Sequence, residues 1–391
     1  MSLRYFLPGQ PEAMRLAGFD VHAVSSPGLD LVEFGRDERV HTHEIRMTRR
    51  ITPLRDLIAV AKLYRTFRRI RPEIVHAHTP KGGLLGMLAA RLARVPVRIY
   101  HIHGLAFVTR RGLKRRLLRW TEQVASRCAT RVLCVSRSIR EVVIEERITN
   151  RDPIVLLGGS INGVDARSRF SPDLKPVHRA RVRKAHGIAD DALVIGYVGR
   201  VVRDKGLVEL TAAWEALSYA IPQAHLLIVG PFEAEDPVPR DVERSLREHP
   251  RVHLHGIDWE TPPLYSAMDV VVLPSYREGL PFVPLEAAAM ELPVVATRIP
   301  GCVDAVRDGV TGTLVEPRDP DALARAIRQY IENEALARAH GRAGRAWVLR
   351  EFDQSRVWAA LSRHYGEALA EMGSTIGLQR DTSAEATTRD H

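Results

Sequence analysis

Residues 270–297 read VVVLPSYREGLPFVPLEAAAMELPVVAT and contain the clearest signals of secondary structure in the chain. Val270–Pro274 is an apolar β-rich run, a loop with Gly and Pro follows, and a helical pattern begins near Pro284. A second apolar run comes at Pro293–Ala296. Strand, helix and strand in this order predict a parallel βαβ unit, because parallel strands need a crossover connection. The runs are apolar on both faces, which is typical of a sheet that helices cover on both sides.

The same alternation extends over most of the 391 residues in two blocks. A turn-rich seam, GGSINGVDARSRFSP at 158–172, separates them, so we predict an N-terminal domain 1–170 and a C-terminal domain 171–372. Each is expected to be a Rossmann-like, doubly wound α/β domain, and their carboxyl edges are expected to face a shared cleft. The other apolar runs are Val21–Ser25, Ile74–Ala77, Val97–His101, Val132–Val135, Leu193–Val198 and Leu226–Val229.

The two ends of the chain depart from this pattern. Residues 373–391 are polar and aperiodic, which predicts a disordered tail. The chain opens with MSLRYFLPGQ and is at once in a helical pattern, whereas a domain of this kind normally starts with a buried strand. We therefore expect the N-terminal domain to lack its first strand.

Charge and cysteine content narrow the classes of function. Lys and Arg number 57 against 47 Asp and Glu, and the net charge of +10 favours an anionic partner such as a nucleotide, a lipid diphosphate, an anionic membrane or a nucleic acid. The three scattered cysteines imply no disulfide framework, and no apolar run is long enough to cross a bilayer. We expect a cytoplasmic protein that can still lie on a membrane.

A basic, glycine-bearing loop follows the apolar run at 193–198. It contains Gly199, Arg200 and Lys205, and a helical pattern starts directly after it. Backbone N–H groups at a helix start, together with two cations, suit a diphosphate. The alternative is a solvated loop with surface charges. The Walker sequence is absent, so ATP hydrolysis of the P-loop kind is not expected.

Two glutamates stand eight positions apart in the stretch quoted first. Glu278 is in the loop with Gly279, Leu280 and Pro281, and Glu286 is in the helix that follows. A carboxylate fixed on a helix can accept hydrogen bonds from two sugar hydroxyls, and the loop N–H groups can contact a diphosphate or a sugar. Such a spacing also arises by chance, but the strand–loop–helix context favours the functional interpretation.

Histidines and a lysine follow two strands of the N-terminal domain. His103, two residues after His101, is expected to face the cleft, where it could donate a hydrogen bond to a sugar hydroxyl or a leaving phosphate. His78 and Lys81, in the loop HTPKGG, could bind an acceptor diphosphate or form a simple turn. HxH pairs recur along the chain, but no carboxylate or cysteine cluster completes a coordination shell, so no catalytic metal is expected.

The stretch RRGLKRRLLR at 110–119 is strongly basic. Leu113, Leu117 and Trp120 fall at helical spacing among its cations. The pattern predicts either an interfacial helix on an anionic membrane or a solvated helix with one apolar stripe on the core.

Together these stretches resemble the retaining glycosyltransferase family 4, of GT-B fold, which includes bacterial capsule, O-antigen and phosphatidylinositol mannosyltransferases. The resemblance runs from about Gly9 to about Met372 and is strongest over Leu273–Thr297, which is similar to the EX7E segment of the family. YVGRVVRDKG, GSINGVD, VHAHTPKGGLLGMLAA, HIHG and DGVTGTLVEPRDPDALARAI support it. FLPGQ, HAHTPKGG and HIHGLAF most resemble the subgroup that builds cell-surface polysaccharide repeats on a polyprenyl diphosphate.

The resemblance implies roles for the candidate residues. Arg200 and Lys205 would grip the donor diphosphate and stabilise the leaving group. Glu286 would hold the nucleotide ribose, and Glu278 and His103 would lie near the donor sugar. The last helix would cross back to the N-terminal domain. The remaining donor-binding positions would be Gly199, Gly279, Leu280 and Pro281.

The reaction implied is a retaining transfer of a hexose-type sugar from a nucleoside-diphosphate sugar, with UDP the expected nucleotide, to a saccharide on a lipid diphosphate. No metal or other cofactor is implied. The enzyme would be peripheral on the cytoplasmic face of the inner membrane and would not bind nucleic acid. A UDP-N-acetylglucosamine epimerase of the same architecture and a non-catalytic nucleotide-sugar binder stay open as alternatives, and a nucleic-acid binder ranks below them.

Overall fold

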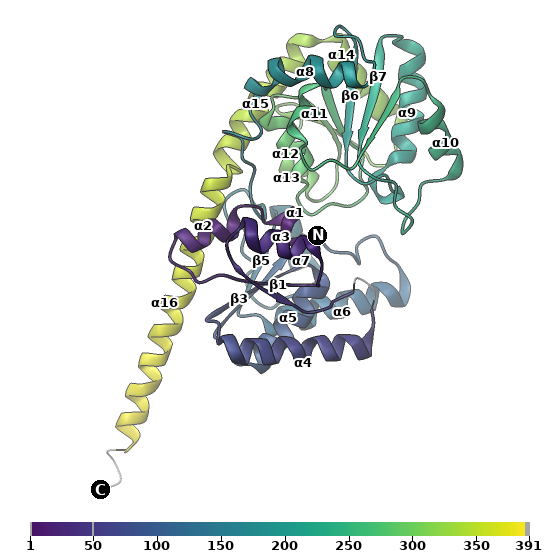
Figure 1. Ribbon diagram of the computed structural model, residues 1–391. Helices are drawn as coiled ribbons and strands as arrows, with labels where there is room; N and C mark the ends of the chain where they lie inside the picture. Colours follow the sequence, from purple (N-terminus) through teal and green to yellow (C-terminus); the bar gives the residue numbers. More distant parts are fainter. Residues whose placement is uncertain (1, 49–50, 388–391) are drawn as a thin grey trace. The chain divides into compact units, whose positions relative to one another are not determined.

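The computed structural model describes residues 2–48 and 51–387, and the chain divides into two compact units. Within these limits, unit 1 comprises residues up to 135, 139–162 and the segment from 355, and unit 2 comprises 136–138 and 163–354. Each unit has parallel strands covered by helices (Figure 1). Apart from the short segment 136–138, the chain passes into unit 2 after Asn162 rather than at residue 170, because Val164 N–H donates to the Phe352 carbonyl at 2.8 Å and ties the following segment to unit 2.

Unit 2 contains one six-stranded parallel sheet in the order β11-β10-β9-β6-β7-β8. Its first strand in the chain, β6, is central, and the order of connection reverses between β6 and β9. Trp214 and Ile327, from helices on one face, are buried in its core. The strands are β6 Leu193–Val198, β7 Ala224–Val229, β8 Val252–Gly256, β9 Val270–Leu273, β10 Val294–Thr297 and β11 Gly312–Val315. The helices are α8 Lys175–Ala185, α9 Leu207–Ala220, α10 Arg240–Glu248, α11 Pro262–Ser266, α12 Phe282–Ala289, α13 Cys302–Ala305, α14 Pro320–Glu332 and α15 Glu334–Glu351.

Unit 1 has two parallel sheets, β1-β2 and β3-β4-β5, instead of one. Its helices include α4 and α6, on either side of α5. The strands are β1 His22–Ser25, β2 His41–Glu44, β3 Ile74–His78, β4 Val97–Ile102 and β5 Arg131–Cys134. The helices are α1 Ser2–Phe6, α2 Gln10–Leu16, α3 Leu29–Asp37, α4 Pro53–Ile70, α5 Pro80–Leu92, α6 Gly112–Cys128, α7 Arg137–Glu145 and α16 Gln354–Thr387.

Unit 1 has a break between β1 and β3 at the place where unit 2 has its central strand β6. Placed end to end, the unit 1 sheets run β2-β1, a break, then β3-β4-β5, whereas β8-β7 and β9-β10-β11 of unit 2 flank the central strand β6. In unit 1 the break is a cavity of about 400 Å³, lined by 21–26 and 74–79 together with apolar side chains such as Met14, Leu63 and Phe67. No strand among the described residues lies there.

Helix α16 begins in unit 2 at Gln354 and continues in unit 1, where Leu361 and Tyr365 pack against Met14 and Ile99. Residues 373–387, which the sequence predicts to be disordered, continue this helix, and 388–391 lie outside the described residues. Helix formers such as Leu, Gln, Arg, Glu and Ala in this stretch favour the extension. No helix of the described chain is long and apolar enough to cross a membrane.

Helix α6 contains most of the basic stretch. Leu113, Leu117 and Trp120 are exposed, so these side chains are not an apolar stripe on the core. The side of α6 that packs inward instead contains small or polar residues such as Ala125 and Glu122. The predicted alternative of a stripe on the core is therefore wrong.

Candidate active site

Two loops follow β6 and β9 in unit 2. Because β6 and β9 are neighbours where the connection order reverses, the loops 199–206 and 274–281 leave the same edge of the sheet at its switch point. Open α/β sheets bind ligands at this place. The loop at 199–206 and the loop at 274–281 contain most of the residues that the sequence predicts to bind the donor.

A close backbone contact joins the two loops at Gly206. Its φ is +74°, and a Cβ on it would lie 1.9 Å from the Pro274 carbonyl oxygen, so only glycine fits. Tyr276 N–H also donates to the Asp204 carbonyl at 2.9 Å. Gly206 precedes the first residue of α9, Leu207, so the positive end of this helix dipole is fixed beside the loops. The geometry suits an anion.

Both predicted cations are paired with carboxylates. Lys205 Nζ forms an ion pair with Glu278, and the two side chains are only 18% and 11% exposed. Arg200 Nη1 lies 2.7 Å from Glu233, with the arginine 46% exposed. Glu233 was not predicted from the sequence, although it follows the carboxyl end of β7, which pairs with β6. The structure thus brings Lys205 and Glu278, 73 positions apart, into direct contact.

Glu286 lies on α12, which begins at Phe282, two residues before the predicted start near Pro284. Its Oε2 accepts a hydrogen bond of 2.8 Å from the Tyr265 hydroxyl. Burial raises the pKa of Glu286, and the hydrogen bond from Tyr265 opposes that rise. Carboxylate oxygens have several lone pairs, so Glu286 can still accept hydrogen bonds from the hydroxyls of a ligand.

A further set of residues fixes the Gly279–Pro281 turn. Ser136 Oγ donates to the Gly279 carbonyl at 2.8 Å, and Gly301 N–H donates to Ser138 Oγ at 2.7 Å. A Cβ on Gly301, whose φ is +86°, would lie 2.4 Å from the Gly279 carbonyl oxygen. Sequence reasoning missed these residues because Ser136 and Ser138 come shortly after β5, a strand of unit 1. The only local signal was the Pro-Gly turn at 300–301.

The other predicted residues lie in unit 1. His78 Nδ1 is 2.9 Å from His103 Nε2, and the Phe6 ring packs edge-on against His103 with 5.4 Å between centroids. Burial lowers the pKa of His103 well below its ordinary value, so the ring is neutral near pH 7. Lys81 Nζ lies 2.7 Å from Asp56 Oδ1, a partner on α4 that the sequence did not indicate.

Two family models match the chain. The model described as glycosyl transferases group 1 matches residues 178–347, and the glycosyl transferase 4-like domain matches residues 9–159. The two matches fall mainly in unit 2 and unit 1, respectively.

Among curated proteins, the capsular polysaccharide biosynthesis glycosyltransferase CapM of Staphylococcus aureus is 35% identical over 364 residues, covering 93% of this chain and 94% of CapM. The UDP-Gal:alpha-D-GlcNAc-diphosphoundecaprenol alpha-1,3-galactosyltransferase of Escherichia coli is 29% identical, covering 81% of each chain. Among solved structures, Anabaena HepE in complex with UDP and glucose has a TM-score of 0.75 at 21% identity, covering 92% of this chain and 96% of HepE. The last likeness concerns the fold.

Proposed function

The chain belongs to the glycosyltransferases that combine a glycosyl transferase 4-like domain with a glycosyl transferases group 1 domain. It is a glycosyltransferase of the bacterial polysaccharide group with a GT-B fold, and on this basis we propose its reaction. We propose that it transfers a hexose-type sugar from a UDP-sugar to a lipid-diphosphate-linked saccharide, with retention of the anomeric configuration. The observation that carries the donor site is the Lys205–Glu278 ion pair, which joins the two switch-point loops beside the start of α9.

The donor diphosphate would lie against the α9 N-terminus, with Arg200 and Lys205 as its cationic partners. During transfer the bond between the anomeric carbon and the diphosphate oxygen breaks, and negative charge grows on the leaving diphosphate. Groups fixed where charge develops stabilise the transition state more than the ground state. Glu286 would accept hydrogen bonds from the ribose hydroxyls. Glu278 would hold Lys205 and lie next to the donor sugar, with Gly279, Leu280 and Pro281 along the diphosphate and Gly199 at the start of the loop.

Retention follows if the acceptor oxygen bonds to the anomeric carbon on the face that the diphosphate leaves. The acceptor hydroxyl proton then passes to the departing diphosphate oxygen, which balances the charge without a carboxylate nucleophile. His103, neutral near pH 7, would donate a hydrogen bond to the donor sugar. Because two cations and a helix end supply the electrostatic stabilisation, donor binding would need no metal.

Two observations support a lipid-linked acceptor. One relative has diphosphoundecaprenol in its name, and one face of α6 exposes large apolar side chains. Leu113, Leu117 and Trp120 are exposed among basic residues, the composition of a helix that lies in the plane of an anionic membrane. We propose that α6 brings unit 1 to the cytoplasmic membrane surface, and that Lys81, with the loop that follows His78, lies near the acceptor diphosphate.

A thermal-shift panel of UDP, GDP, ADP and TDP tests the donor site. A ligand that binds only the folded chain raises Tm by mass action. We expect UDP to raise Tm of the wild type, Lys205→Ala to lose that rise, and Lys184→Ala, an exposed lysine of α8, to keep it. UDP release should require the lipid-linked acceptor. Conversion of the UDP-sugar without an acceptor would instead favour the epimerase, and UDP binding without turnover would favour a non-catalytic binder.

A further inference from the structure

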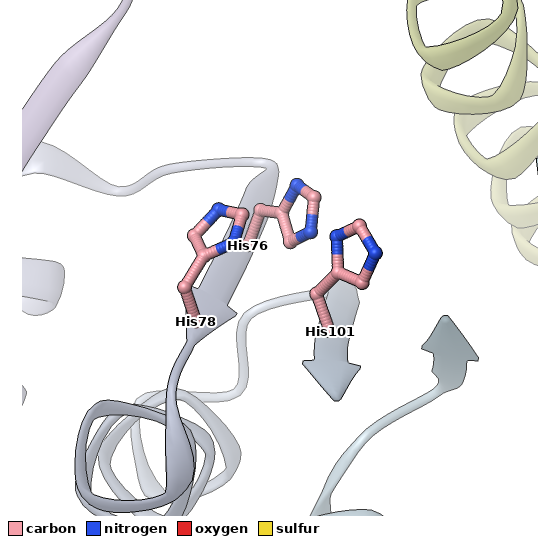
Figure 2. A group of neighbouring side chains, drawn as sticks. All are labelled: His76, His78 and His101. Carbon is pink, nitrogen blue, oxygen red and sulfur yellow. The ribbon is translucent and has the colours of Figure 1, made fainter. Parts of the chain in front are cut away.

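Three histidines lie side by side on neighbouring strands of unit 1. His76 and His78 are on β3 and His101 is on β4, where it pairs in register with His78 (Figure 2). One ring nitrogen of each lies within 4.8 Å of the others. We infer that His76, His78 and His101 form a binding site for a borderline divalent metal ion such as Zn²⁺, separate from the donor loops of unit 2.

The hydrogen bonds of the rings leave inner nitrogens available. His76 Nδ1 lies 2.6 Å from the Tyr365 hydroxyl, while His76 Nε2 is buried without a hydrogen-bond partner among the described residues. His101 is 4% exposed, and its Nδ1 is buried and equally unpartnered in the described chain. A buried, unpaired nitrogen is unfavourable unless something binds it. Metal-bound histidines typically engage an outer partner through the second ring nitrogen, as His76 does with Tyr365 and His78 does with His103.

The chemistry of the donor set fits Zn²⁺. Neutral imidazole has a lone pair on one ring nitrogen and is a preferred ligand of Zn²⁺. Three neutral imidazoles with a fourth position for water are a known zinc arrangement. Tetrahedral Zn²⁺ with Zn–N bonds of about 2.05 Å puts the nitrogens about 3.3 Å apart. Small side-chain rotations would bring the three rings to that spacing.

An ion can reach the three histidines, and its binding would affect His103. The cavity between β1 and β3 is lined by His76 and His78, which gives an ion and its water a route in. The other outer partner, His103, lies against His78. A bound metal would fix the His78 ring and, through it, the position of His103. The metal would therefore act as a positioning element of unit 1.

Other histidine groups in the described chain do not bring three ligand atoms this close. The rings of His225 and His253 in unit 2 are stacked, with His225 Nδ1 2.9 Å from His253 Nε2. This pair resembles the group of His76, His78 and His101 in ring packing alone. His253→Gln is therefore a matched control for a histidine removed from a stacked pair.

Metal content and Co²⁺ spectra test the inference on the full chain, which is first stripped of metal by chelation and dialysis. After Zn²⁺ is added back and the excess is removed, we expect one equivalent of Zn²⁺ by elemental analysis, and titration of the stripped chain with Co²⁺ should give the visible bands of tetrahedral Co²⁺. His101→Gln should weaken binding more than tenfold, and Tyr365→Phe, which keeps the ring in the core, should weaken it about 10–100-fold, while His253→Gln should not change it. Circular dichroism identifies a variant that does not fold, and Tyr365→Phe then carries the test.

The inference is overturned if the wild type binds less than one equivalent of either ion. It is also overturned if folded His101→Gln and Tyr365→Phe bind as tightly as the wild type. The UDP thermal shift is measured on the same samples with and without metal. A UDP shift of equal size in the metal-loaded and the chelated samples supports two separate sites, so failure of one proposal is distinguishable from failure of the other.

Discussion

Glu122 makes the stability of unit 1 depend on pH. It lies on α6, is 4% exposed, and accepts a hydrogen bond of 2.5 Å from the Tyr100 hydroxyl of β4. Burial raises the pKa of Glu122 from 4.5 to about 7, with the Tyr100 hydrogen bond opposing the rise. Because the folded state holds the proton more tightly, the stability contribution is complete below pH 4.5 and is lost as pH rises through 7. A rise of this size corresponds to about 3 kcal/mol.

Glu122→Gln keeps an acceptor for Tyr100 and removes the ionisation. Urea unfolding at pH 5 and pH 8 measures the effect. We expect similar stability for the variant and the wild type at pH 5, and a variant more stable by up to about 3 kcal/mol at pH 8. Glu141→Gln, an exposed glutamate of α7, is the control and should give no such difference. An advantage of Glu122→Gln that is equal at both pH values would refute the reasoning.

Two further predictions concern the loops and the sheet. Gly206→Ala should lower Tm and abolish the UDP response, because its Cβ would collide with Pro274, whereas Gly187→Ala, at φ +66° with nothing within 4 Å, should cost only the backbone strain of about 1 kcal/mol; equal losses of Tm would show that the loop contact is unimportant. A strand copied from Leu193–Val198 and joined ahead of Ser2 by a short linker should raise Tm in calorimetry by filling the cavity beside β1, and a polar strand of the same length should not. Equal Tm shifts for the apolar and the polar extension would refute the idea that the added strand fills this cavity.

Strands and their following loops could be predicted from the sequence because their signals are local. Runs of residues that are apolar on both faces of the strand indicate β6 and β9, and Gly, Pro and charged residues indicate the loops after them. Once β6 and β9 are neighbours, the loops that contain Lys205 and Glu278 lie side by side, so the contact between these two residues follows from the topology, and their role in donor binding stays a prediction. The α/β class and the parallel sheets are confirmed for the same reason.

What the sequence could not provide is the set of contacts made by residues far apart in the chain. Ser136 supports Gly279 although it directly follows a strand of the other unit, and Asp56 pairs with Lys81 from the start of α4. In the sequence the histidines of this group form two separate HxH pairs, at 76/78 and 101/103. Only the register between β3 and β4 shows that two such pairs share one face of the sheet. None of these contacts has a local spacing that would reveal it.

The two carboxylates beside the donor cations differ in how readily a diphosphate can replace them. The Arg200–Glu233 pair is the more exposed of the two, and exposed ion pairs contribute about 0–1 kcal/mol, so an incoming anion would displace Glu233 at little cost. Lys205 and Glu278 are much less exposed, and separating them would leave a poorly solvated carboxylate. An ammonium group has three donors, however, so Lys205 can bind a phosphate oxygen while it still holds Glu278. In the proposed donor site, Arg200 would therefore be the cation that exchanges partners on binding, and Lys205 the cation whose position is fixed beforehand.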